Sequence, residues 1–331
     1  MNILIPDTIF PDDHAIERAA AAPLDIVIES AQKAGDLSAE VWSGADALVA
    51  HHLMPYDKMI AEAAANARIL VRVGVGVDNI DLDVWSARGV AVCNVPDYGT
   101  GEVADHALAL TLSLLRGTVA YQGRIFDLPE DAEFDRMPIP APVRRIAGLN
   151  CLAVGYGAIG RAFADRARGL GMKVGFFDPE IAPGSWEVTQ VHRFSSLEAG
   201  LEVADVVSLH LPLTENTSNI IDTTALAAMK PDAVLINTAR GGLVDTDAVA
   251  DALQAGVLGG VGLDVFPAEP LPATDRLLAA VRRHEEWARD RVALTPHVGG
   301  VSPQSLEELR RRAVETARDF LIDGTLVNRI A

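Results

Sequence analysis

Short apolar runs alternate with stretches of helical periodicity along almost the whole chain. The apolar runs are rich in Val, Ile, Leu and Ala, as expected for strands that are buried on both faces. The pattern predicts an α/β fold of doubly wound parallel sheets that helices cover on both faces. The predicted strands are 2–6, 25–29, 47–50, 69–73 and 90–93 in a first series, then 150–154, 173–177, 205–209, 233–237, 259–265 and 292–295.

Helical periodicity fills most of the gaps between these strands. The predicted helices are 56–65, 81–87, 101–115, 158–170, 246–255 and 303–322. Between the two series lies a polar, proline-rich segment, 121–145. Its composition predicts an exposed connector, and its position suggests a domain boundary.

Length and charge narrow the class of protein. A chain of 331 residues is long enough for two domains, and its formal net charge of −18 disfavours binding to nucleic acid. No apolar run approaches the ~20 residues that a membrane helix needs. The first residues lack the basic region of a secretion signal, so we expect a cytoplasmic protein that binds neither nucleic acid nor membrane. Cys93 and Cys151 match no metal-ligand spacing, which predicts buried, reduced thiols and no metal site.

A glycine-rich turn is the sharpest local signal. The apolar run 151–154 leads into Gly155-Tyr156-Gly157-Ala158-Ile159-Gly160, and a helical pattern follows. In such a turn Gly155 allows the tight bend, Gly157 lets the backbone approach a pyrophosphate, and Gly160 lets the helix pack on the strand. The helix N-terminus then offers N–H groups to the phosphates.

Asp178 ends the next predicted strand, at the spacing where a carboxylate binds the adenosine ribose hydroxyls. A carboxylate there would repel a 2′-phosphate, so the pattern favours NAD over NADP. The alternative is an ordinary strand-to-helix turn followed by a solvated aspartate.

Three residues with complementary chemistry each follow a predicted strand: Arg240, Glu269 and His297. Arginine binds carboxylates through two parallel hydrogen bonds, and histidine exchanges protons near neutral pH. A carboxylate beside a histidine stabilises its protonated form. Taken singly, they could be a surface charge, a turn residue and a structural loop histidine.

His51 and His52 also follow a predicted strand. They could lie at the ligand-binding edge of the first sheet, or they could be exposed loop residues. The sequence leaves the two possibilities equal.

Taken together, these motifs resemble those of the D-isomer-specific 2-hydroxyacid dehydrogenases. This family includes phosphoglycerate, glycerate and formate dehydrogenases and the C-terminal-binding-protein corepressors. Segments 94–100 and the stretch before Val292 look most similar to the corepressor-like branch. The runs that carry the resemblance are 73–81, the glycine turn, 210–214, 237–242, 262–265 and 295–297.

The resemblance implies roles for individual residues. Arg240 would bind the substrate carboxylate, His297 would be the acid/base, and Glu269 would be its partner. The backbone of Val75 and Gly76 would also bind the carboxylate. The implied NAD contacts are Gly155, Gly157, Ala158, Ile159, Gly160 and Asp178, with Leu211, Pro212, Thr217, Thr238 and Ala239 along the cofactor and Asp264 on the nicotinamide carboxamide.

The resemblance also implies two Rossmann-like, doubly wound parallel-sheet domains with a cleft between them, and a particular assembly. Residues 1–100 and 296–331 would form a discontinuous substrate-binding domain, and 101–295 would form the NAD-binding Rossmann domain. A homodimer built through the cofactor domain is expected. One departure concerns 298–301, where many relatives have an aromatic residue and this chain has Val-Gly-Gly-Val, so the pocket wall differs.

The favoured function is an NAD-dependent oxidoreductase that moves a hydride between nicotinamide and C2 of a small 2-hydroxy or 2-oxo acid. The alternative is an NAD(H)-responsive dimeric binding protein of the corepressor type. A formate-type reaction needs no proton shuttle, and the intact Glu269 and His297 argue against it.

Overall fold

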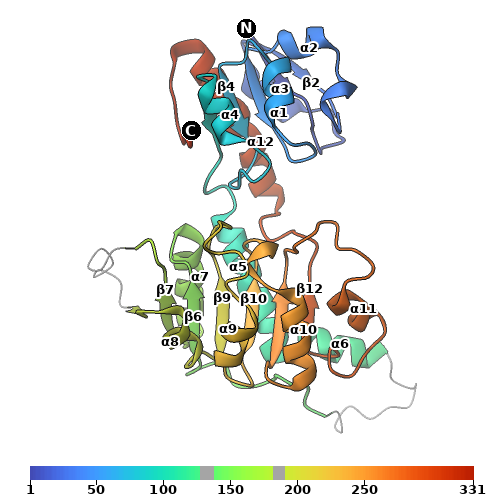
Figure 1. Ribbon diagram of the computed structural model, residues 1–331, viewed down its shortest axis with the longest axis vertical. Helices are drawn as coiled ribbons and strands as arrows, with labels where there is room; N and C mark the ends of the chain where they lie inside the picture. Colours follow the sequence, from blue (N-terminus) through green and yellow to red (C-terminus); the bar gives the residue numbers. More distant parts are fainter. Residues whose placement is uncertain (127–137, 182–190) are drawn as a thin grey trace. The chain divides into compact units, whose positions relative to one another are not determined.

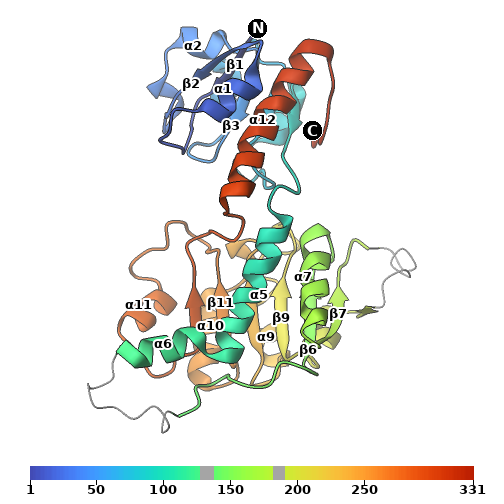
Figure 2. The same cartoon turned by 180° about the vertical axis from the view of Figure 1, so that it is seen from behind.

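The computed structural model describes residues 1–126, 138–181 and 191–331. The chain divides into two compact units: Met1–Gly99 with Val301–Ala331, and Thr100–Gly300. Figure 1 colours both units by sequence, and Figure 2 shows them from behind.

The first unit is built on a five-stranded parallel sheet of order β2-β1-β3-β4-β5. Apolar side chains leave this sheet on both faces, with Ile3 and Ile5 in one core cluster and Leu4 in another. Helices α1 and α12 cover one face, and α2, α3 and α4 cover the other. The bounds are β1 Asn2–Ile5, β2 Asp25–Ile28, β3 Ala47–Ala50, β4 Ile69–Arg72, β5 Ala91–Cys93, α1 Ala15–Ala21, α2 Ala39–Ser43, α3 Lys58–Ala63, α4 Leu82–Ala87 and α12 Pro303–Asp323.

The second unit has a seven-stranded parallel sheet of order β12-β11-β10-β9-β6-β7-β8. The strand order reverses between β6 and β9. In open α/β sheets ligands bind beyond the carboxyl ends of the strands at such a reversal. The bounds are β6 Asn150–Val154, β7 Lys173–Phe177, β8 His192–Arg193, β9 Val206–Leu209, β10 Val234–Asn237, β11 Gly260–Leu263 and β12 Val292–Leu294.

Helices cover both faces of the second sheet. Helices α5 and α7 lie on the face seen in Figure 2, and α8, α9 and α10 lie on the face seen in Figure 1. Along β6, Cys151 and Ala153 face the first group while Leu152 and Val154 face the second, because side chains alternate along a strand. The bounds are α5 Thr100–Arg116, α6 Thr118–Phe126, α7 Ala158–Gly169, α8 Leu197–Leu201, α9 Thr223–Ala228, α10 Thr246–Ala255 and α11 Arg276–Arg282.

These sheets confirm the predicted α/β class with two parallel-sheet domains, and they place the predicted strands to within a residue or two. The expectation for 121–145 needs correction. Residues 121–126 belong to α6, residues 127–137 lie outside the described residues, and the chain passes between units at 99–100 and 300–301 instead. Residues 138–145 belong to the second unit, where the Arg144 guanidinium donates to the backbone oxygens of Asp205 and Asp232. Residues 138–145 are thus part of the second unit, with Pro140 and Pro142 buried, so the polar, proline-rich composition does not mark a domain boundary here.

Both cysteines are buried and free. Burial raises the pKa of Cys93 to about 11 and that of Cys151 to about 12, which keeps both thiols protonated and unreactive. Across residues 1–126, 138–181 and 191–331, no helix is both long and apolar enough to cross a bilayer.

Candidate active site

The glycine turn between β6 and α7 is built so that only glycine fits at two of its positions. Gly155 has a φ of 95°, and a Cβ there would lie 2.7 Å from the backbone carbonyl of His210. A Cβ on Gly160 would lie 2.1 Å from the backbone oxygen of Gly155. Strand, turn and helix therefore meet backbone to backbone, which is the packing that a dinucleotide turn needs.

Gly157 differs from its two neighbours because the space beside it is open. It is the N-cap of α7, and an added Cβ would meet no described atom within 4 Å. No side chain caps the helix there, and Ala158 is exposed while Ile159 is half-buried in the first turn. The N-terminus of α7 thus presents backbone N–H groups to a space that suits a pyrophosphate.

Asp178 lies just past β7 and is tied to the glycine turn. One of its carboxylate oxygens accepts a hydrogen bond from the Tyr156 backbone N–H at 2.8 Å, and the other accepts from the Glu180 N–H at 2.9 Å. The Tyr156 ring stacks on Phe176 with the ring centres 4.0 Å apart. The carboxylate is thus fixed beside the turn, at the position predicted for a ribose ligand.

The loop after β9 is closed by its own side chains. The Thr217 hydroxyl donates to the Pro212 backbone oxygen at 2.7 Å and accepts from the Thr214 N–H at 2.8 Å. Leu211 is buried beside them. His210 lies beneath the glycine turn, where burial lowers its pKa to about 3 and keeps the ring neutral.

The loop after β10 begins with Thr238 and Ala239. The Ala239 N–H donates to the Asn237 side-chain oxygen at 3.0 Å. The Thr238 hydroxyl is buried and has no hydrogen-bond partner within the described parts of the chain. A buried hydroxyl without a partner is uncommon in folded proteins, and here it fits a contact to a bound molecule.

Glu269 and His297 form a hydrogen-bonded pair. Nδ1 of His297 lies 2.7 Å from Oε2 of Glu269, and Oε1 of Glu269 accepts from the Phe266 backbone N–H at 2.9 Å. Since an ionised carboxylate can only accept, the proton of the pair lies on Nδ1. Nε2 of His297 is then the nitrogen that can exchange a proton with a bound molecule, and the His297 side chain is 54% exposed.

Arg240 follows β10, the strand next to β11. Its backbone oxygen accepts hydrogen bonds from the Asn237 side chain at 2.8 Å and from the Leu243 N–H at 3.2 Å, which fix the turn. A Cβ on Gly241 would lie 1.9 Å from the backbone of Phe266, so the loops after β10 and β11 are in direct backbone contact.

The structure thus brings some predicted site residues into one unit. Arg240, Glu269 and His297 follow the neighbouring strands β10, β11 and β12, and the last two are in contact. His297 lies in the second unit, although the expected boundary at 295–296 would have assigned it to the first.

Val75 and Gly76 belong to the first unit, in the loop after β4. Val75 is 45% exposed, and its backbone oxygen accepts from the Asn94 side chain at 2.8 Å.

The two histidines after β3 have different surroundings. His51 is buried, its backbone N–H donates to Asp7 at 2.8 Å, and its ring meets Phe10 edge-on. Burial lowers the pKa of His51 to about 3. His52 is exposed. The possibility of two exposed loop histidines therefore holds for His52 and is wrong for His51.

His106 and Thr295 are not among the functional residues predicted from the sequence. His106 of α5 and Thr295, just after β12, contact each other and the buried carboxylate of Asp264. His106 is a polar residue in a largely apolar helix, which was the one available signal.

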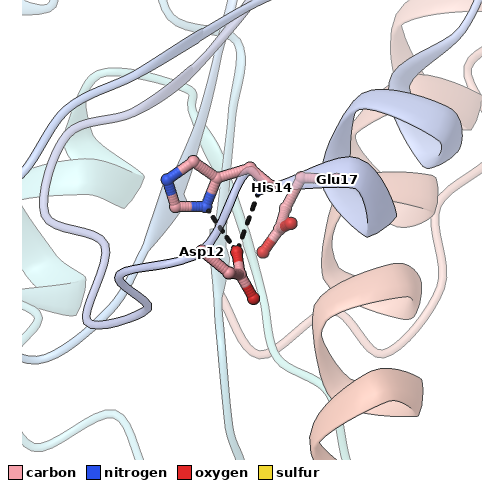
Figure 3. A group of neighbouring side chains, drawn as sticks. All are labelled: Asp12, His14 and Glu17. Carbon is pink, nitrogen blue, oxygen red and sulfur yellow. Dashed lines mark hydrogen bonds and ion pairs between the residues drawn. The ribbon is translucent and has the colours of Figure 1, made fainter.

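Asp12, His14 and Glu17 in the first unit bring three donor atoms within 4.8 Å of one another (Figure 3). The Arg310 guanidinium lies 2.6 Å from an oxygen of Asp12 and 2.6 Å from an oxygen of Glu17. Because this buried guanidinium already balances the two carboxylates, the cluster is explained as an ion pair between α1 and α12.

Comparison with known proteins agrees with this geometry. Residues 108–299 match the family model described as "D-isomer specific 2-hydroxyacid dehydrogenase, NAD binding domain". The (S)-sulfolactate dehydrogenase of Chromohalobacter salexigens is 37% identical over 279 residues, which cover 84% of this chain and 85% of that protein. The D-3-phosphoglycerate dehydrogenase of Mycobacterium tuberculosis is 35% identical over 83% of this chain, but only 49% of its own length is matched.

Among solved structures, the TT0316 protein of Thermus thermophilus superimposes with a TM-score of 0.86. It is 31% identical, and the match covers 100% of both chains. The glycine turn, the parallel sheets and the matched family model lead to one assignment. The chain belongs to the D-isomer specific 2-hydroxyacid dehydrogenases and is an NAD-dependent oxidoreductase of that family.

Proposed function

We propose that this protein transfers a hydride between the nicotinamide of NAD and C2 of a small 2-hydroxy or 2-oxo acid, with His297 as the acid/base. The observation that carries the proposal is the 2.7 Å pair between His297 and Glu269, in the unit that also contains the glycine turn. NAD supplies the hydride chemistry, and the protein supplies orientation, charge and the proton.

In the direction of reduction, Nε2 of His297 donates a proton to the carbonyl oxygen as the hydride reaches C2. In the direction of oxidation, the same nitrogen accepts the hydroxyl proton. Glu269 accepts from Nδ1 and stabilises the imidazolium that exists before donation or after uptake. The Phe266 N–H holds the carboxylate in place for this role.

Arg240 would bind the substrate carboxylate, because a guanidinium matches a carboxylate with two parallel hydrogen bonds and is always charged. The backbone N–H groups of Val75 and Gly76 would bind the same carboxylate from the first unit. These roles are supported by the motif positions and by the fixed turn at Arg240.

The proposed cofactor contacts follow from the geometry of the glycine turn and the loops beside it. Gly155, Gly157, Ala158, Ile159 and Gly160 would bind the pyrophosphate, and Asp178 would accept from the ribose hydroxyls. Asp178 would repel a 2′-phosphate, which supports NAD over NADP. Asp264 would contact the nicotinamide carboxamide. Further contacts would come from Leu211, Pro212, Thr217, Thr238 and Ala239.

The two dehydrogenases compared above are named for sulfolactate and 3-phosphoglycerate, both 2-hydroxy acids with a second anionic group. Small acids of this class are therefore the first substrates to test. The run 298–301 contributes no aromatic side chain, so the pocket wall here differs from that of relatives with one.

The test is a substrate panel of 2-oxo acids with a second anionic group, such as 3-sulfopyruvate and 3-phosphohydroxypyruvate, and without one, such as glyoxylate, pyruvate and hydroxypyruvate, with NADH absorbance as the readout. The wild type should oxidise NADH with at least one acid. His297→Ala should lower kcat by about 10²- to 10⁴-fold, the usual contribution of a general acid, with the Kd of NADH unchanged within about twofold. An unchanged kcat would overturn the acid/base role.

Tight NADH binding by the wild type, with no turnover of any acid, would instead favour the NAD(H)-responsive binding protein of the corepressor type. A binding protein would retain the glycine turn that binds the dinucleotide, but it would not need His297 as an acid/base. The panel therefore separates the two functions.

We also propose that the protein is a homodimer. Support comes from α6, where Val119, Ile125 and Phe126 are large apolar side chains that are 54%, 50% and 77% exposed. Sedimentation velocity should give twice the monomer mass, and charged substitutions at Val119 and Ile125 should return the monomer. A monomeric wild type at micromolar concentration would contradict the proposal.

A further inference from the structure

We propose that His106, a residue of α5, is a positioning residue for His297 and acts through Thr295 and Asp264. The inference rests on the proposed function, in which His297 is the acid/base. It assigns a task to a side chain that no motif of the dinucleotide turn or of the Glu–His pair includes.

The Asp264 carboxylate binds residues on both sides of His297 in the sequence. Asp264 is 1% exposed, and its carboxylate accepts from the Thr295 hydroxyl at 2.6 Å, the Val298 N–H at 2.9 Å and the Gly299 N–H at 2.8 Å. These donors lie on both sides of His297 along the chain. One buried carboxylate therefore fixes the loop before and after the catalytic histidine.

The backbone of His297 has an unusual conformation. Its φ is 55°, in the left-handed region that residues with a Cβ rarely adopt. Its N–H donates to the Asp264 backbone oxygen at 2.7 Å. Such a conformation persists where the surrounding contacts determine it, and the contacts to Asp264 are those that hold it here.

The hydrogen bonds among His106, Thr295 and Asp264 have a defined direction. Nε2 of His106 lies 2.8 Å from the Thr295 hydroxyl oxygen and 3.4 Å from Oδ1 of Asp264. The single hydroxyl hydrogen of Thr295 is already donated to Asp264, so Nε2 of His106 must carry a proton and donate to Thr295. The series of hydrogen bonds runs from His106 through Thr295 to Asp264, and hydrogen bonds aligned in this way strengthen one another.

Packing supports the same arrangement. A Cβ on Gly299 would lie 2.9 Å from Oδ2 of Asp264 and 3.5 Å from the His106 ring, so the loop lies directly against both side chains. Burial acts to raise the pKa of Asp264, but hydrogen bonds from His106, Thr295 and the two N–H groups outweigh it, and the pKa lies below its usual value. The carboxylate thus remains charged and able to hold the loop.

Both oxygens of Asp264 are engaged with the loop in this arrangement. Asp264 can therefore influence the reaction through the position of His297, whether or not it also meets the nicotinamide. His106 is the member of the chain that comes from outside the sheet-edge loops, which makes it the cleanest place to test the idea.

The experiment compares His106→Ala with His106→Gln. The amide of glutamine can donate from about the position of Nε2, whereas alanine cannot. We expect His106→Ala to lower kcat about 100-fold, since small misplacements of a catalytic group cost this much, with KM and the Kd of NADH within about twofold. His106→Gln should recover most of the loss.

A double mutant tests the coupling through Thr295. Thr295→Val removes the hydroxyl and should lower kcat by a similar factor, and Thr295→Ser should retain most activity. Because the two residues act in one chain, His106→Ala with Thr295→Val should be little worse than either change alone. Thr111→Val is the matched control, since it removes another buried hydroxyl bond within α5, to the Ala107 backbone oxygen, and kcat should not change.

Several results would overturn the proposal: wild-type kcat in His106→Ala, equal losses in the alanine and glutamine variants, or multiplicative losses in the double mutant. If His106→Ala does not fold, His106→Gln and Thr295→Ser decide the question by their activity. Absence of turnover by the wild type would instead count against the proposed function.

Discussion

At the scale of single residues, the proposed reaction depends on three side chains in the loops that follow neighbouring strands. Arg240, Glu269 and His297 could be predicted as a group because the carboxyl ends of parallel strands meet at one edge of a sheet. The 2.7 Å contact between Glu269 and His297 is what this reasoning leads to. His106 could not be predicted in the same way, because it reaches Thr295 from a covering helix and only tertiary packing brings the two together.

Arg240→Lys tests the assigned carboxylate contact. A single ammonium cannot reproduce the planar pair of hydrogen bonds, so kcat/KM should fall about 10- to 100-fold, the usual range for a lost charged hydrogen bond. The Kd of NADH, measured by fluorescence titration, should stay unchanged. Arg282→Lys on the exposed side of α11 is the control, and its kcat/KM should equal that of the wild type. A change confined to NADH affinity would contradict the role of Arg240.

At the scale of elements, strand positions were the most predictable feature. Strands buried on both faces are continuous apolar runs, so β3 and β6 have the bounds that the sequence indicates, and so does the partly exposed β7. Strand β8 is only two residues long, and α6 begins before a polar, proline-rich segment, so neither has a pattern long enough to recognise.

The glycine turn offers a matched pair of substitutions. In Gly157→Ala the new methyl meets no described atom, so the thermal midpoint should stay within a few degrees while NADH affinity falls at least about tenfold, because the methyl enters the pyrophosphate space. In Gly160→Ala the methyl meets the Gly155 backbone oxygen at 2.1 Å, so stability should fall as well. Calorimetry and NADH titration separate these effects. Unchanged NADH affinity in Gly157→Ala would show that the cofactor phosphates lie elsewhere.

At the scale of the whole molecule, a net charge of −18 repels anionic substrates and cofactors at long range. Salt screens that repulsion beyond roughly 8 Å at physiological ionic strength, so local groups decide binding. In the proposed site, Arg240 and the N-terminus of α7 would supply the local positive potential. A strongly acidic chain can therefore bind dinucleotides and small acids, although its total charge argues against nucleic acid.

Stability should depend on the ion pairs that join Arg310 of α12 to Glu17 of α1 and to Asp12, just before α1. The hydrogen bond from Arg310 lowers the pKa of Asp12 to about 2, so its stabilisation is present above the unfolded-state pKa near 4 and is lost as pH falls towards 2. Asp12→Asn should cost about 1 kcal/mol or less at pH 6, since the Asp12 side chain is 47% exposed, and clearly less at pH 2, where about half of the Asp12 carboxyl is already protonated.

Urea unfolding at both pH values measures this difference. Asp13→Asn is the control, since it removes a neighbouring carboxylate that accepts from the Ala15 N–H and leaves the Arg310 pair intact. Equal destabilisation by Asp12→Asn at pH 6 and pH 2 would mean that the charge of Asp12 is not what stabilises the contact.

We propose that a hydride passes directly from NADH to C2 of a 2-oxo acid, with the proton supplied by His297. NADH carrying deuterium at the transferred position of C4, incubated with an accepted 2-oxo acid in ordinary water, tests it most directly. Mass spectrometry should find one deuterium on C2 of the 2-hydroxy acid product with the wild type, and the same label formed far more slowly with His297→Ala. Product without deuterium, or NADH that binds and never transfers its label to any acid, would contradict the claim.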